Sequence, residues 1–311
     1  MFMSDIIFHH YPPSPVAEKV RKTFGIKGLA WASCEENRLP PRPELFAMTG
    51  GYRRIPVMQI GADIYCDTQC ILRELDKRFP TPALAPAGRG GMAFALSRFT
   101  DSEMFTHAFK AVLAPAAAQL PPEFVADRGR LYLGPDHDMA KEAEDMPHTL
   151  SQLRPMLGWV DDCLTETGAF ITGEDAKMPD ILIWYLVWFL KGRWADAASF
   201  FEEFDGVNQW AERMEAIGQG EMSEISPEDA LAVCKGATPA TAEASDDRDP
   251  QGLKVGMNVS VEPLTDSGEE AVTGILRAVS RDSVALTLSN DEAGEHAVHF
   301  PRVGYRVRGV Q

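Results

Sequence analysis

Two short stretches of the sequence offer the groups needed to hold a small zwitterion. Pro56 follows Ile55 at the head of an apolar run, where a strand tolerates a residue without an N–H. A cis bond between them would turn the backbone N–H and C=O of Ile55 outward, toward an extended ligand. Asp67 and Thr68 precede residues at helical spacing, so Thr68 is the expected N-cap of a helix. The positive end of that helix would hold a carboxylate and Asp67 an ammonium, and one end of an amino acid has both.

A second candidate lies upstream, at the start of another predicted helix. Residues 5–24 indicate a short strand, a Pro-Pro turn, and a helix with Ser14 as N-cap and Pro15 at its first position. Apolar residues recur every fourth position from Val16 to Phe24, which predicts a buried stripe. The Ser14 hydroxyl is therefore either a helix cap alone or a cap that also serves a bound group.

The order and spacing of these segments resemble the cytosolic glutathione transferase superfamily over residues 4–234. The residues that carry the resemblance are Ser14-Pro15-Val16-Ala17-Glu18-Lys19-Val20-Arg21, Ile55-Pro56, Asp67-Thr68, Gly173 followed by Pro179-Asp180-Ile181, and Trp210-Ala211-Glu212-Arg213-Met214. One residue departs from the pattern, since Lys177 stands where the family has a Ser or Thr in the capping box of Asp180. The resemblance implies a homodimer and glutathione as co-substrate. It also implies the glutathione-binding residues, which are Ile55, Pro56, Asp67 and Thr68.

Ser14 falls where the family places its catalytic hydroxyl or thiol. Omega-like members have a cysteine at this position, whereas zeta- and theta-like members have a serine. A serine hydroxyl can donate to the glutathione thiolate, but it cannot form mixed disulfides. A hydrogen bond to a charged acceptor is worth about 1.5–3 kcal/mol, or roughly one to two pKa units. We therefore expect Ser14 to stabilise the thiolate, with Tyr11 and His10 as alternative donors.

Composition and charge exclude several other functions. The 311 residues carry a formal charge of −16, and only residues 1–80 are mildly basic, with 11 Lys and Arg against 9 Asp and Glu. This balance argues against a nucleic-acid partner. The apolar block Ile181–Leu190 is too short to span a membrane. Five scattered cysteines without a signal-like segment indicate a reducing cytoplasm. Cys66 and Cys70 lack CxxC spacing and companion histidines, so no metal is expected.

The sequence predicts three domains of different classes. The resemblance implies an α/β thioredoxin-like domain over residues 1–82 and an all-α bundle domain over residues 88–234. Residues 235–252 are small and acidic without an apolar period, which is typical of a linker. Residues 253–311 alternate between apolar and polar positions and predict a small all-β, barrel-like domain that folds separately. The alternating positions are Val259, Val261, Val272, Gly274, Leu276, Val284, Leu286, Leu288, Val298 and Phe300, with Tyr305-Arg306-Val307 as a fifth strand.

Two function classes follow from these features. The resemblance implies an enzyme that directs the glutathione thiol at a small hydrophobic electrophile, with Phe105 and Phe109 in the pocket for that substrate. Helical spacing alone would make both aromatics core residues. The alternative is a non-catalytic binding or adaptor protein that works through its C-terminal β domain, and Ser14 disfavours a thiol-disulfide reductase. The polar residues that could form a binding face on that domain are His296, His299, Arg302, Tyr305 and Arg306.

Overall fold

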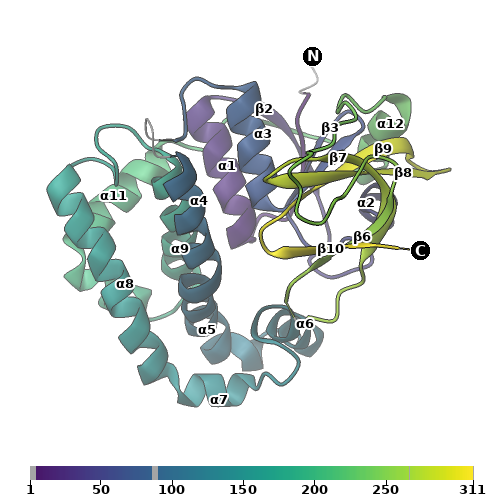
Figure 1. Ribbon diagram of the computed structural model, residues 1–311. Helices are drawn as coiled ribbons and strands as arrows, with labels where there is room; N and C mark the ends of the chain where they lie inside the picture. Colours follow the sequence, from purple (N-terminus) through teal and green to yellow (C-terminus); the bar gives the residue numbers. More distant parts are fainter. Residues whose placement is uncertain (1–4, 86–89, 266, 311) are drawn as a thin grey trace. The chain divides into compact units, whose positions relative to one another are not determined.

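The computed structural model describes residues 5–85, 90–265 and 267–310, and the chain divides into two compact units. The first, the sheet unit, contains all of the described strands, and the second, the helical unit, is all helical (Figure 1). The sheet unit comprises Met1–Val20, Gly28–Lys77 and Gly220–Gln311, and the helical unit comprises Arg21–Lys27 and Arg78–Gln219.

The sheet unit is built on one ten-stranded sheet with the order β10-β6-β7-β8-β9-β4-β3-β1-β2-β5. Strand β1 runs parallel to β2 and antiparallel to β3, and β3 runs antiparallel to β4, which gives the predicted thioredoxin-like half. Strands β6–β10 form an antiparallel half and contain all of the predicted alternating positions. The strands are β1 Ile7–His10, β2 Ala30–Glu35, β3 Val57–Ile60, β4 Asp63–Cys66, β5 Glu221–Glu224, β6 Asn258–Pro263, β7 Val272–Val279, β8 Ser283–Asn290, β9 Gly294–Pro301 and β10 Tyr305–Gly309.

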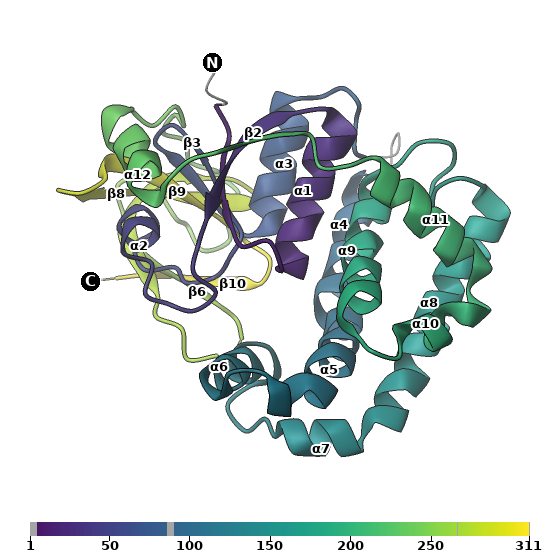
Figure 2. The same cartoon turned by 180° about the vertical axis from the view of Figure 1, so that it is seen from behind.

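Four helices accompany this sheet, and they are α1 Pro15–Lys27, α2 Pro43–Thr49, α3 Thr68–Arg78 and α12 Pro227–Gly236. Helices α2 and α12 lie side by side against the sheet (Figure 2). Leu45 and Met48 of α2 and Cys234 of α12 are fully buried in its main apolar core. On α1 and α3, the Lys19 ammonium donates to the Thr68 hydroxyl at 3.2 Å.

The two halves of the sheet join where β4 pairs with β9. These strands run parallel, and Ile64 lies opposite Val298. A single apolar core continues across the junction and includes Val57 and Ile64 together with Val259, Leu286 and Phe300. The separate folding that we expected for residues 253–311 is therefore not what the structure shows. The edge of β9 that could have closed a barrel instead pairs with β4. This pairing joins residues far apart in the sequence, so no local sequence pattern predicts it.

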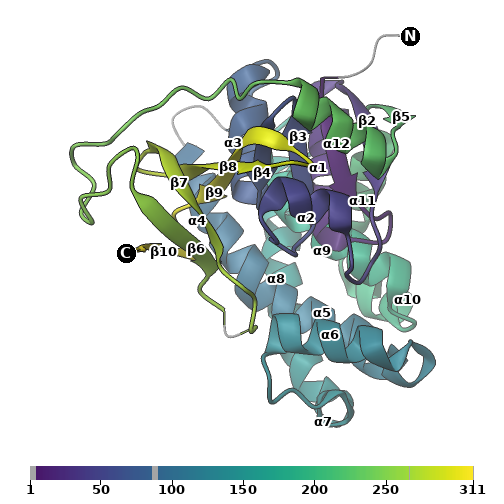
Figure 3. The ribbon, with the colours of Figure 1, turned by 90° about the vertical axis from the view of Figure 1, so that its right-hand side faces the viewer.

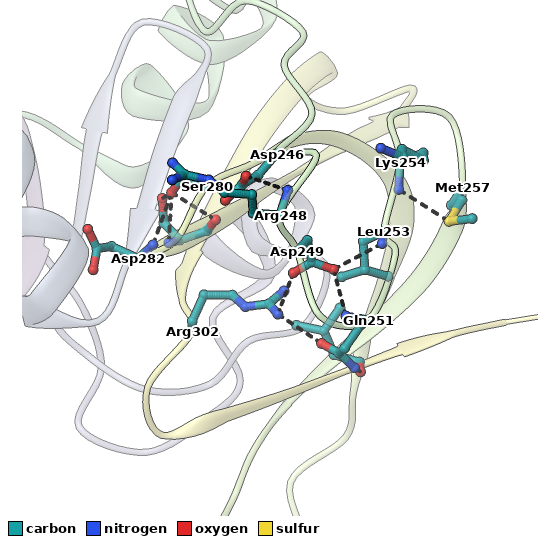
Figure 4. A network of polar contacts seen from close by, with 12 residues as sticks. Asp246, Arg248, Asp249, Gln251, Leu253, Lys254, Met257, Ser280, Asp282 and Arg302 are labelled. Carbon is teal, nitrogen blue, oxygen red and sulfur yellow. Dashed lines mark hydrogen bonds and ion pairs between the residues drawn. The ribbon is translucent and has the colours of Figure 1, made fainter.

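The predicted linker runs as an extended segment from α12 to β6 (Figure 3), and hydrogen bonds tie it to the sheet unit. Near its start, the Asp63 carboxylate of β4 accepts from the Ala240 N–H at 2.6 Å and from the Thr241 hydroxyl at 2.5 Å. Near its end, Arg302 donates to Asp249 Oδ1 at 2.8 Å, while Asp249 Oδ2 caps the following turn (Figure 4). The segment is therefore a tied connection, although its composition is typical of a flexible one.

The helical unit ends at Gln219, earlier than the predicted residue 234, because β5 pairs with β2 and α12 covers the sheet. Its helices are α4 Gly90–Phe99, η1 Thr100–Met104, α5 Phe105–Ala116, η2 Ala117–Gln119, α6 Pro122–Leu133, α7 Met139–Glu144, α8 Met146–Thr167, α9 Met178–Arg193, α10 Ala197–Phe200, η3 Phe201–Glu203 and α11 Asp205–Ala216. Among the described residues, no helix has the length and apolarity needed to cross a membrane.

Helix α9 is capped despite the unusual Lys177. The Asp180 carboxylate accepts from the Lys177 N–H and the Ile171 N–H, each at 2.9 Å, and also from the Trp210 indole at 2.9 Å. Asp180 thus supplies its own half of the capping box, and its bonds with Ile171 and Trp210 fix the carboxylate in that position.

Candidate functional site

The start of α3 forms the predicted corner, but its cap is Asp67 rather than Thr68. Asp67 Oδ1 accepts from the Gln69 N–H at 2.8 Å, and the Asp67 carbonyl accepts from the Ile71 N–H at 3.1 Å. Thr68 is the first residue of the helix, and its hydroxyl accepts from Lys19. Asp67 has φ +72°, a left-handed conformation that Asp tolerates better than most residues. The Ile55–Pro56 bond is cis.

The second oxygen of Asp67 is bound by a residue from the far end of the chain. Tyr305 of β10 donates its phenol proton to Asp67 Oδ2 at 3.1 Å, and the Tyr52 and Tyr305 hydroxyls lie 2.8 Å apart. Burial, followed by the Asp67 charge, raises the pKa of Tyr305 well above its ordinary value. The phenol of Tyr305 therefore stays protonated and remains a donor over the whole neutral range.

A second contact between the C-terminal half and this corner joins two opposite charges. Arg54, the residue before Ile55, donates from Nε to both carboxylate oxygens of Glu269 at 2.9 Å, and its Nη2 also contacts that carboxylate. Arg54 Nη2 further donates to the Thr265 hydroxyl at 2.6 Å. Burial opposes the charge on Arg54, but its hydrogen bonds with Glu269 outweigh burial and raise the pKa of the guanidinium.

The corner is largely covered in this structure. Ile55 is 9% exposed and Thr68 is 4% exposed, while Asp67 is half-buried. Ile55 belongs to the same apolar core as Tyr52 and Tyr305. The pairing of Val57 with Cys66 brings the four predicted binding residues side by side at the ends of β3 and β4, and Tyr305 of β10 lies against Asp67.

The three candidate donors for a thiolate differ in their surroundings. The Ser14 hydroxyl accepts from the Ala17 N–H at 3.2 Å, so Ser14 caps α1 as predicted, and it is 2% exposed. Tyr11 is half-buried and packs against the core that contains Ile55 and Tyr305. The His10 imidazole is buried in the sheet unit, where it stacks on Phe8 and lies 2.9 Å from the hydroxyl of Ser33. His10 is thus a packing group of the sheet rather than part of the corner.

The two aromatics predicted for the hydrophobic pocket are buried in the helical unit. Phe105 and Phe109 stack at 5.9 Å between ring centroids, and both contact the Tyr132 ring edge to face. A cavity of about 640 Å³ in the same unit is lined by other residues, among them Leu120, His137 and Met139. The contacts of Phe105 and Phe109 are those of core residues, which was the alternative to a pocket role.

A buried polar group that the sequence did not reveal lies beneath α12. His9 and Cys34 are opposite one another on β1 and β2, and His9 Nδ1 lies 3.0 Å from Glu36 Oε1. His9 Nε2 lies 3.0 Å from Gln59 Oε1, and Gln59 donates to the Ala230 carbonyl of α12 at 2.9 Å. Burial lowers the pKa of His9, but its hydrogen bonds to Cys34 and Glu36 prevail and raise it to about 10.

That pKa makes the buried group an imidazolium–carboxylate pair at neutral pH. His9, Cys34 and Glu36 are all of metal-ligating types, and their ligand atoms lie within 4.8 Å of one another. Both ring nitrogens of His9 are nevertheless engaged by protein oxygens, so we assign the group to the attachment of α12.

The polar residues predicted to form a C-terminal binding face instead hold separate parts of the sheet unit together. His299 stacks on Tyr65 with 4.3 Å between ring centroids and lies 2.9 Å from Asp63. His296 is fully buried. Arg302 binds the linker, Tyr305 binds Asp67, and Arg306 lies 3.5 Å from Glu262 of the neighbouring strand. The predicted face is therefore not assembled.

Comparison with known proteins supports the fold described above. Residues 8–83 match the sequence profile of the glutathione S-transferase N-terminal domain. The crystal structure of a GST-like protein from Pseudomonas syringae is 32% identical with a TM-score of 0.81, and the match covers 99% of this chain and 100% of that chain. This match extends through the C-terminal strands.

More distant structures share the fold alone. A glutathione transferase from Phanerochaete chrysosporium is 18% identical with a TM-score of 0.57, and the match covers 70% of this chain and 98% of that one. Glutathione transferase F7 from Populus trichocarpa is 14% identical with a TM-score of 0.53, covering 68% of this chain and 93% of that one. No curated protein sequence matches significantly. With its cis Ile55–Pro56 step, its Asp67-Thr68 corner and a full-length relative at 32% identity, the chain belongs to the glutathione transferase superfamily.

Proposed function

We propose that the protein binds glutathione at the corner formed by Ile55, Asp67 and Thr68 and activates its thiol for attack on a small hydrophobic electrophile. The observation that carries this proposal is the pairing of Val57 with Cys66, which places the cis Ile55–Pro56 step beside the N-terminus of α3. The first helical turn offers N–H donors for the carboxylate of the γ-glutamyl group, and Asp67 offers a partner for its ammonium. Family membership supports a cytoplasmic homodimer.

Activation of the thiol is assigned to Ser14. Its bond with the Ala17 N–H uses a lone pair of the hydroxyl oxygen and not the hydroxyl proton, so capping α1 and donating to a thiolate are compatible roles. The thiolate would then form a C–S bond with the electrophile, whose leaving group departs with the bonding pair. Tyr11 is the alternative donor, because its ring packs against the core that contains Ile55.

Retention of the wild-type protein on immobilised glutathione, followed by elution with free glutathione, tests binding. Turnover of a panel of electrophiles, followed by loss of free thiol, then tests catalysis. Retention together with turnover supports the enzyme. Failure to bind glutathione at any accessible concentration contradicts the proposal.

A second candidate is a binding protein that keeps the fold without catalysis. The observation that favours it is the contact of Tyr305 and Glu269 with the corner, because a site covered from within the chain has limited room for a second substrate. Retention on glutathione without turnover of any electrophile would select this candidate.

A further inference from the structure

Two side chains of the C-terminal half lie against the glutathione corner, and their chemistry complements it. The Tyr305 phenol donates to the Asp67 carboxylate, which is the group proposed to bind the ligand's ammonium. The Glu269 carboxylate accepts from the Arg54 guanidinium, next to the Ile55 backbone. The C-terminal half thus places a hydrogen-bond donor, Tyr305, against the Asp67 carboxylate. It places a carboxylate, Glu269, against the Arg54 guanidinium.

We propose that Tyr305 and Glu269 form an intrachain occupant of the corner that competes with glutathione and keeps the site closed until β10 moves. This inference rests on the proposed function, since it concerns the regulation of the same site. Glutathione carries one ammonium and two carboxylates, so its ammonium and one of its carboxylates can replace the two intrachain partners. A ligand that offers only one of these charges displaces only one contact.

The contacts around these two residues show that the occupant is a built feature of the sheet unit. The Tyr305 hydroxyl also lies 2.8 Å from the Tyr52 hydroxyl, and Tyr305 as a whole is 7% exposed. Next to Tyr305 along the chain, the Val303 carbonyl accepts from the Gln69 side chain at 3.2 Å, within the first turn of α3. Val303 and Tyr305 therefore bind Gln69 in the first turn of α3 and its cap residue Asp67.

The position of β10 in the sheet makes its release feasible without unfolding the rest. Among the described strands it pairs with β6 alone, so it is an edge strand. Glu269 lies between β6 and β7, outside regular structure. Edge strands and loops are the parts of a fold that open at low free energy.

Competition of this kind has a quantitative consequence. If the corner is open in only a fraction of molecules, the apparent dissociation constant for glutathione is the intrinsic constant divided by that fraction. Removing the polar groups of Tyr305 and Glu269 should therefore tighten glutathione binding, whereas most mutations near a binding site weaken it.

The test is isothermal titration calorimetry of reduced glutathione with the full-length protein. The Tyr305→Phe/Glu269→Gln variant removes the hydroxyl that donates to Asp67 and the negative charge that pairs with Arg54, while it keeps the size of each side chain. The matched control is Tyr132→Phe/Glu270→Gln, which deletes a phenol hydroxyl in the helical unit and the charge of the exposed glutamate adjacent to Glu269. We expect the first variant to bind glutathione at least tenfold more tightly than wild type and the control to stay within about twofold.

Asp67→Ala, introduced into wild type and into the Tyr305→Phe/Glu269→Gln variant, separates failure of this inference from failure of the proposed function. If Asp67→Ala weakens binding but the Tyr305→Phe/Glu269→Gln variant binds no more tightly than wild type, the closed-site inference is wrong and the corner assignment stands. If none of the proteins binds glutathione, the corner assignment fails and the inference fails with it.

Hydrogen exchange on the wild-type protein gives a second test that needs no variant to fold. The proposal predicts that saturating glutathione speeds exchange of the backbone amides of β10, residues 306–309. Slower or unchanged exchange of these amides at saturating glutathione would overturn it.

Discussion

The phenol of Tyr305 donates to the carboxylate of Asp67 across 238 positions of sequence, with 3.1 Å between the two oxygens. Asp67 also caps α3, so one carboxylate connects the thioredoxin-like half of the sheet unit to the C-terminal strands. The pairing of β4 with β9 and the shared apolar core connect the same two halves. The extra strands are therefore a structural part of the unit that contains the candidate site.

Truncation after residue 240 tests this connection. The shorter chain would expose core residues such as Val57 and Ile64, which are fully buried in the complete protein, and each large apolar side chain returned to water costs about 1.5–3 kcal/mol. We expect the melting temperature followed by circular dichroism to fall by more than 10 °C, or the cooperative transition to disappear. A truncated chain that melts like the full-length protein would show that the C-terminal half folds separately after all.

The attachment of the linker to β4 predicts where protease will cut. Asp63→Asn removes the charged acceptor that binds Ala240 and Thr241, and we expect it to create a cleavage site between residues 235 and 252 in limited proteolysis. Asp247→Asn is the control, since Asp247 lies on the same segment and its side chain is 94% exposed. Equal cleavage of wild type and Asp63→Asn within this segment would mean that the tie does not hold it.

The buried His9–Glu36 pair predicts a pH dependence of stability. The pKa of His9 is raised to about 10 in the folded protein, whereas an unfolded His titrates near 6.5. Stability from the pair should thus be fully present below about pH 6.5 and lost as the pH rises through about 10. Chemical denaturation between pH 6 and 10 should show this decline in wild type and a flatter profile in Glu36→Gln.

Glu35→Gln is the matched control for that measurement, because Glu35 is adjacent and exposed. Its stability profile should follow that of wild type. A Glu36→Gln protein with the wild-type profile would show that the decline comes from other groups.

The Ser14 assignment predicts a shift in the pKa of bound glutathione. Ser14→Ala removes a donor worth about 1.5–3 kcal/mol to a charged acceptor, so the pKa of the bound thiol should rise by roughly one to two units while its affinity stays within a few-fold. Thiolate absorbance as a function of pH measures this change. An unchanged titration in Ser14→Ala together with a shifted one in Tyr11→Phe would transfer the role to Tyr11. Ser14→Cys should gain disulfide exchange.

Much of this architecture follows from local sequence patterns. The period-two residues gave all five C-terminal strands, and the Asp67-Thr68 pair marked the start of α3. These features depend on hydrophobic alternation and helix capping, which a short window of sequence contains. The sequence predicts Thr68 as the N-cap of α3, whereas the structure has Asp67 in that role, because Asp and Thr are both good N-caps.

Features that depend on distant pairing were not predictable in this way. Strand β5 is polar and exposed, and it forms only because β2 offers a free edge. The His9–Glu36 pair and the Tyr305–Asp67 contact join residues 27 and 238 positions apart. His9 and Tyr305 lie in strands, whereas Glu36 and Asp67 follow the ends of β2 and β4, and no local pattern indicates which distant residue each of them bonds.

Calorimetric titration of reduced glutathione into wild-type protein and Asp67→Ala tests the central claim most directly. The account predicts binding at least tenfold weaker in Asp67→Ala, because the variant leaves the ligand's ammonium without its charged partner, an interaction worth about 1.5–3 kcal/mol. Asp205→Ala is the control, an exposed aspartate in the first turn of α11, and it should bind like wild type. Equal glutathione affinity in wild type and Asp67→Ala would contradict the assignment of the corner as the glutathione site.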